Sequence, residues 1–80
     1  QVKVLMAEKV ISKILSKEGH IDILKIDVEG LEVAIIQSLS PDSLKRIDRI
    51  YAETIFPENL PGFQKEQYGG IVRFSKALNN

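Results

Sequence analysis

The segment Ile21–Val28, IDILKIDV, constrains the fold of this chain more than any other stretch. Apolar side chains occupy both alternating faces of this run, at Ile21, Ile23, Leu24, Ile26 and Val28. A strand that is apolar on both faces is typical of the interior of a parallel sheet, where helices cover the two sides. The segment therefore predicts a central strand of an α/β protein.

Strand-type and helix-type patterns alternate along the rest of the chain. The expected strands are Val2–Met6, Ile47–Ile55 and a late one within Tyr68–Ser75, and the expected helices are Ala7–Lys17, Gly30–Leu39 and a short one starting at Ser40 and Pro41. Phe56–Gly70 reads as one long connection. The order strand, helix, strand, helix, strand predicts right-handed βαβ units. The expected fold is thus α/β, a parallel βαβαβ arrangement with helices packed on the sheet and a late C-terminal strand.

The composition narrows the class of protein. Eighty residues support one domain whose core is marginal without a partner, and the lack of cysteine excludes disulfides and thiolate zinc sites. Eleven basic and eleven acidic residues cancel without long blocks of one sign, so we expect no nucleic-acid partner. No apolar run approaches the ~20 residues that span a bilayer. We expect a cytoplasmic protein without a membrane contact.

Three carboxylates, Asp27, Glu29 and Glu32, follow the central strand closely, with Gly30 among them. In open parallel sheets, ligands bind beyond the carboxyl ends of the strands. Carboxylates there can hold a divalent cation, accept a proton from a substrate hydroxyl, or bind a ligand amine or ribose. Glu53, an acidic residue in the next apolar strand, is expected at the same edge of the sheet.

A purely structural interpretation of these residues is equally open. Glu29 and Glu32 suit the first turn of a helix, where the helix dipole stabilises negative charge by ~0.3 to 1 kcal/mol. Lys25 and Asp27 lie two residues apart on one face of a strand and can neutralise each other. His20, the one histidine, is interpreted as a solvated turn residue.

The residues IDILKIDVEGLE resemble the hallmark segment of the FkbM family of S-adenosylmethionine-dependent methyltransferases. Asp22, Lys25, Asp27, Glu29, Gly30 and Glu32 all match that pattern. Glu53 in IYAETI matches the acidic residue of the family's following strand. The resemblance covers Ile21–Ile55 well and the flanking residues poorly.

The resemblance implies a Rossmann-like methyltransferase fold and transfer of a methyl group from S-adenosylmethionine to a hydroxyl of a sugar or natural product. It implies catalytic roles for Asp27 and Glu29, and substrate-binding roles for Lys25, Glu32 and Glu53. The family's glycine-rich donor-binding turn has no match in these residues. Residues 1–80 are therefore expected to form a single partial domain, the C-terminal half of the fold, without the first donor-binding half and inactive alone.

Two other functions remain open. One is a non-catalytic α/β interaction module that assembles through the edges of its sheet. The other is a carboxylate–metal enzyme or phosphoacceptor domain that uses Asp27, which is disfavoured because no acidic pair follows an earlier strand. Unpaired strand edges and an apolar helix at Gly30–Leu39 predict a homo-oligomer.

Overall fold

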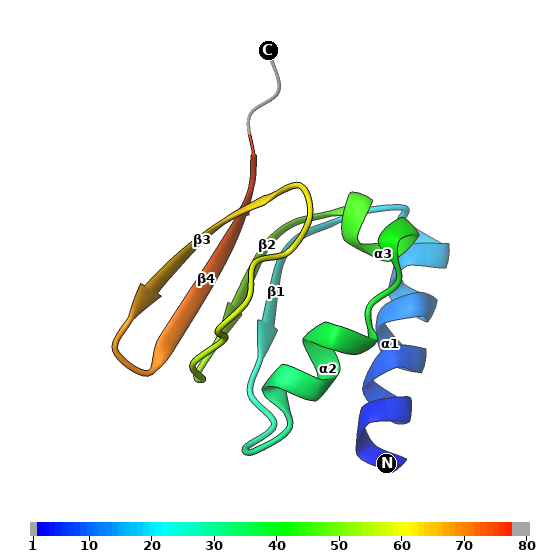
Figure 1. Cartoon of the computed structure of the whole chain (residues 1–80). Helices are drawn as coiled ribbons and strands as arrows, with labels where there is room; N and C mark the ends of the chain where they lie inside the picture. The colour runs from blue at the N-terminus through cyan, green and yellow to red at the C-terminus, as the bar shows by residue number, and fades with distance from the viewer. Residues whose placement is uncertain (1, 78–80) are drawn as a thin grey trace.

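The computed structural model describes residues 2–77 and has an α/β fold, in which three helices pack beside one four-stranded sheet (Figure 1). The helices are α1 (Val2–Glu18), α2 (Glu32–Ser38) and α3 (Pro41–Lys45). The strands are β1 (Ile21–Ile26), β2 (Ile47–Ala52), β3 (Phe63–Tyr68) and β4 (Ile71–Lys76). At α3 the expected start is confirmed, because the Ser40 hydroxyl accepts a hydrogen bond from the Ser43 N–H and Pro41 opens the helix.

The sheet is mixed, with the strand order β1-β2-β4-β3. Strands β1 and β2 are parallel, paired from Ile21 with Ile47 to Ile26 with Ala52, whereas β4 runs antiparallel to both β2 and β3. The expectation of an entirely parallel sheet is therefore wrong. Only Gly69 and Gly70 separate β3 from β4, and a connection of two residues can join only antiparallel neighbours.

Strand β3 lies inside the stretch that was expected to be a long loop. Its sequence, FQKEQY, is polar between its terminal aromatic residues and carries no apolar alternation. It forms the edge of the sheet, and a polar edge strand discourages pairing with other chains. Its pairing with β4, and not its own hydrophobicity, makes it a strand.

The expected strand Val2–Met6 is also wrong, because these residues form the first turns of α1. Ile11 and Leu15 are buried, and Val4 and Ala7 pack against the same core at helical spacing. Extending the existing helix adds one backbone hydrogen bond for each residue fixed, whereas a strand here would need a neighbour to pair with. Helical periodicity therefore decides the structure over the preference of valine for strands.

The core lies between the sheet and α2, where Ile35 and Ile36 are 1% exposed. Inward-facing residues of the sheet complete it, at Ile26, Ile50, Ala52, Val72 and Phe74. Phe56, from the connection after β2, sets its ring edge-on to Phe74, with 5.2 Å between the ring centroids. Burying each of the larger side chains contributes about 1.5–3 kcal/mol, so α2 is held firmly against the sheet.

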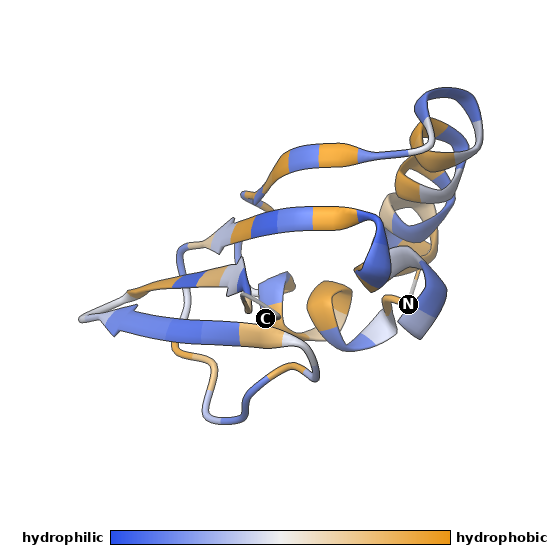
Figure 2. Cartoon of the chain, turned by 90° about the horizontal axis from the view of Figure 1, so that it is seen from above, coloured by the Kyte–Doolittle hydropathy of each residue, from blue (hydrophilic) through white to orange (hydrophobic). Residues whose placement is uncertain are grey.

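Helix α1 packs against α2 (Figures 1 and 2). Of the apolar residues expected at Gly30–Leu39, Ile35, Ile36 and Leu39 are buried. Leu31 and Val33 are partly buried against the core, and Ala34 is exposed. Exposed large apolar side chains gather on α1, in a group that we call the α1 stripe: Val2, Leu5, Met6, Val10 and Ile14. Others lie outside α1, at Ile23, Ile55, Tyr68 and Ile71.

Gly30 connects the end of β1 to α2 with a φ of +83°, a conformation that costs residues with a Cβ about 1–2 kcal/mol. We expect Gly30→Ala to lower the free energy of unfolding by about 1 kcal/mol. Gly70→Ala is the matched control, because Gly70 also has open space around it but no positive φ, and we expect a change within about 0.5 kcal/mol. Urea unfolding measures both. Equal losses would show that the turn at Gly30 does not depend on its backbone conformation.

Candidate active site at the carboxyl ends of the parallel strands

Asp27 and Glu53 follow the ends of the two parallel strands. Because the last pair of the register joins Ile26 to Ala52, the next residue of each strand emerges at the same edge of the sheet. A shallow concavity of about 290 Å³ opens there, which we call the rim concavity. It is lined by Lys25, Ile26, Asp27, Tyr51, Ala52, Glu53 and Ile71.

Three of the five predicted site residues meet in the rim concavity, namely Lys25, Asp27 and Glu53. All three side chains are exposed. Glu29 lies exposed in the turn before α2 and does not line the concavity. Glu32 is only 5% exposed and occupies the first turn of α2, the position that the helix dipole favours for an acidic residue.

Four residues that line the concavity were not predicted as site residues, namely Ile26, Tyr51, Ala52 and Ile71. Ile26 and Ala52 belong to the buried core. Tyr51 was expected in the core, yet it is half-buried and paired in register with Lys25. Its position two residues before Glu53 was the available signal, since such residues share a face of a strand. Ile71, 47% exposed, belongs to β4, and its position depends on the antiparallel pairing that the sequence did not reveal.

A row of polar side chains continues from the concavity across the sheet. Lys25 pairs with Tyr51, Tyr51 with Arg73, and Arg73 with Glu66. Arg73 donates a hydrogen bond and forms an ion pair with Glu66, and the Tyr68 hydroxyl donates to the same carboxylate at 2.7 Å. The Arg73 guanidinium holds the pKa of Glu66 below its usual range, while hydrogen bonding to Glu66 raises the pKa of Tyr68.

This arrangement suits proton transfer and polar recognition. Two carboxylates at an open edge can accept a proton from a hydroxyl or hold a cationic group. Lys25 and Tyr51 add one cation and one aromatic ring beside them. Among residues 2–77, the carboxylates of Asp27 and Glu53 belong to no group with metal-binding spacing.

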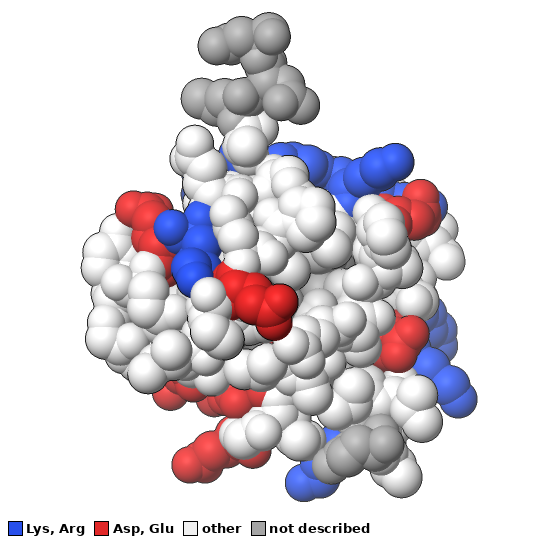
Figure 3. All heavy atoms as spheres, in the orientation of Figure 1, with Lys and Arg blue, Asp and Glu red and all other residues white. Residues whose placement is uncertain are grey.

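Charge elsewhere is dispersed. On the face in Figure 3, Lys and Arg alternate with Asp and Glu, and neither sign gathers in a broad patch. Within the described part of the chain, no helix has both the length and the apolarity that crossing a bilayer requires.

The Glu66 carboxylate gives stability a specific pH dependence. Folding lowers the pKa of Glu66 from 4.5. Its contribution to the free energy of unfolding is therefore complete above about pH 4.5 and is lost as the pH falls through the lower folded-state pKa. We expect Glu66→Gln to be less stable than the wild type at neutral pH and to lose less stability on acidification. Urea midpoints between pH 7 and about pH 3 measure this, with Glu58→Gln, an exposed residue of the β2–β3 connection, as control. Parallel pH profiles for wild type and Glu66→Gln would contradict the account.

One of three comparisons with known proteins finds a match, and it identifies a family. No curated protein and no solved structure matches the chain significantly. The model of the methyltransferase FkbM domain family matches residues 4–80, which is nearly the whole sequence. The match includes both parallel strands, the turn at Gly30 and the two carboxylates of the rim concavity. The chain therefore belongs to the FkbM methyltransferase domain family.

Proposed function

We propose that this domain takes part in S-adenosylmethionine-dependent methyl transfer to a hydroxyl of a small acceptor, such as a sugar or natural product, in the cytoplasm. The observation that carries the proposal is the meeting of Asp27 and Glu53 beside an open concavity at the carboxyl ends of β1 and β2. Membership in the methyltransferase family supplies the reaction class.

Asp27 is the proposed general base. An alcohol is a poor nucleophile until its proton is removed, and a carboxylate within hydrogen-bonding reach removes it as the new bond forms. Glu53 and Lys25, which line the same concavity, would bind and orient the acceptor. Glu29, exposed in the adjoining turn, is a candidate for a second catalytic contact, and Glu32 is proposed to act from the start of α2 by fixing that turn.

The rim concavity is suited to only part of the methyl donor, S-adenosylmethionine. When bound, the donor would supply a methyl group activated on a positively charged sulfur, and Asp27 and Glu53 suit a neighbouring positive charge. The concavity of about 290 Å³ lies at the lower limit for ligand pockets, which span about 300–1,000 Å³. We propose that these residues contact one end of the donor and that calorimetry on the 80-residue chain detects no micromolar binding.

The topology is consistent with part of a larger Rossmann-like sheet. Strand β1 has the hydrophobic pattern of a central strand but lies at the edge of the sheet. As a result, its apolar residue Ile23 is 50% exposed. We propose that residues 1–80 form the C-terminal half of the methyltransferase fold, and that the first half pairs with the free edge of β1 and completes the donor site.

The α1 stripe supports assembly as a second aspect of function. Its five side chains are between 41% and 72% exposed, and exposed apolar side chains grouped on one element are typical of interaction sites. We propose that two copies associate through α1, whereas a non-catalytic interaction module was expected to assemble through the edges of the sheet. Sedimentation at micromolar concentration should give a dimer that Met6→Lys converts to monomer, with Lys45→Glu, an exposed residue of α3, as a charge-changing control. A monomeric wild type would exclude this assembly.

The proposed role of Asp27 predicts a loss of turnover without a loss of folding. In an active protein that carries this domain, Asp27→Asn should lower turnover by about 10²–10⁴-fold, because the amide keeps the shape of the carboxylate but cannot accept a proton. Asp42→Asn, which alters an exposed aspartate paired with Arg46 on α3, is the control and should leave turnover unchanged. Methyl transfer from labelled donor and thermal melting are measured on both. Unchanged turnover with a melting temperature several degrees lower would make Asp27 a structural residue.

A further inference from the structure

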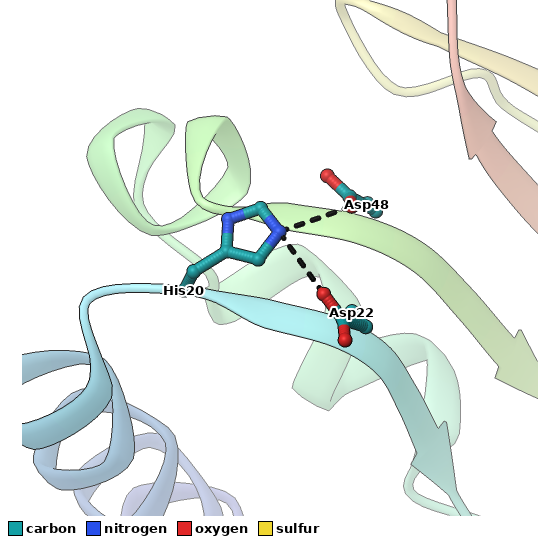
Figure 4. A group of neighbouring side chains, drawn as sticks. All are labelled: His20, Asp22 and Asp48. Carbon is teal, nitrogen blue, oxygen red and sulfur yellow. Dashed lines mark hydrogen bonds and ion pairs between the residues drawn. The ribbon is translucent and has the colours of Figure 1, made fainter.

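A second polar group lies at the opposite end of the parallel strands from the rim concavity. His20 precedes β1, Asp22 lies in β1, and Asp48 lies in β2 (Figure 4). The Nε2 atom of His20 is 3.0 Å from Oδ2 of Asp48 and 3.4 Å from Oδ1 of Asp22. One ligand atom from each of the three lies within 4.8 Å of the others, and within residues 2–77 this is the group with metal-binding spacing.

The backbone fixes all three positions. Gly19 ends α1 with a φ of +77°, and its N–H donates to the carbonyl of Leu15 at 2.8 Å. Immediately after His20, the N–H of Ile21 donates to the carbonyl of Arg46 at 2.8 Å. His20 therefore sits between two hydrogen-bonded residues that limit its backbone movement.

Asp22 and Asp48 hold equivalent positions in the two strands, since the pairs on either side of them, Ile21 with Ile47 and Ile23 with Arg49, are in register. Like charges at directly neighbouring positions of a sheet destabilise it. Nε2 of His20 can donate at most one hydrogen bond, so a protonated Nε2 can serve only one of the two carboxylates well. Both carboxylates nevertheless converge on that nitrogen (Figure 4).

Without an ion, His20 forms a hydrogen bond with Asp48 and an ion pair with Asp22, and the same distances also fit a metal coordination shell. Bonds of about 2.0–2.2 Å from zinc to histidine and carboxylate place tetrahedral ligand atoms about 3.3 Å apart. The contacts of 3.0 and 3.4 Å fall on either side of that value. We propose that His20, Asp22 and Asp48 bind a zinc-type divalent cation between the starts of β1 and β2, independently of the methyltransferase site.

The surroundings leave room for the remaining ligand and set the strength of binding. A concave surface of about 420 Å³, lined partly by Asp22 and Asp48, adjoins the group and can hold water as a fourth ligand. Arg49 and Lys76 line the same surface and add positive charge, while the Lys76 amine donates to the carbonyl of Lys45. Exposed ligands and two nearby cations predict micromolar and not nanomolar affinity.

Zinc titration of the chain followed by calorimetry tests the site. We expect one zinc ion per chain and a melting temperature a few degrees higher with zinc, reversed by a chelator, because the ion binds only the folded pairing of β1 with β2. His20→Gln and Asp48→Asn should each weaken zinc binding at least tenfold. Asp42→Asn, an exposed aspartate outside the group, should bind as the wild type does.

Cobalt provides a measurement that needs no variant. Substituted for zinc, it should give the visible absorption of a tetrahedral site with nitrogen and oxygen ligands, and NMR should place the largest shifts on His20 and on the amides of Asp22 and Asp48. Circular dichroism establishes that each variant is folded. The proposal is overturned if zinc does not bind at about 1 mM, if His20→Gln binds as tightly as the wild type, or if the shifts map elsewhere.

Discussion

The parallel pairing of β1 with β2 is the constraint on which the rest of the structure depends. Its register, from Ile21 with Ile47 to Ile26 with Ala52, fixes which residues lie side by side at both ends of the two strands. A slip of one residue would turn buried side chains such as Ile26 and Ile50 to the opposite face, so core burial enforces the alignment. The same alignment brings Asp27 beside Glu53 at one end and Asp22 beside Asp48 at the other.

Carboxylates can be placed densely after β1 because the chain leaves the core there. Ile26 is buried, Asp27 is exposed, and Gly30 turns the backbone into α2. Ionised groups at an open edge keep most of their hydration, which avoids the large cost of burying a charge. Glu32 is buried, but it lies in the first turn of α2, where the helix dipole stabilises its negative charge.

The sequence predicted the segments whose patterns are strong and local. The apolar run around Ile26 predicted β1, and the apolar residues after Gly30 predicted α2. Ser40 followed by Pro41 predicted the start of α3. The meeting of Asp27 with Glu53 followed from the parallel order of their strands. Val2–Met6 was mistaken for a strand because five residues are too short a window to reveal the helical period that continues to Leu15.

The remaining errors concern the antiparallel half of the sheet. Strand β3 has no hydrophobic alternation. Strand β4 lies between β2 and β3, and this position depends on pairing with both neighbours and not on the local sequence of β4. Ile71 and Arg73 reach the site or its neighbourhood through β4, so their positions could not be predicted from local pattern. Tyr51 was expected in the core because a central strand of a parallel sheet is covered on both faces. In the structure it lies in a row with Lys25 and Arg73 and is only half-buried.

The most direct test of the account measures the distance between Asp27 and Glu53. Because the chain has no cysteine, the double substitution Asp27→Cys with Glu53→Cys creates one pair of thiols. Neighbouring strands lie about 4.8 Å apart, within the reach of a disulfide, so mild oxidation should close the bond rapidly within one folded chain. The control pair Asp22→Cys with Glu53→Cys places the thiols at opposite ends of the strands, more than about 15 Å apart, and should stay reduced. Oxidation of the first pair no faster than the control would contradict the shared acidic edge on which the proposed methyl transfer rests.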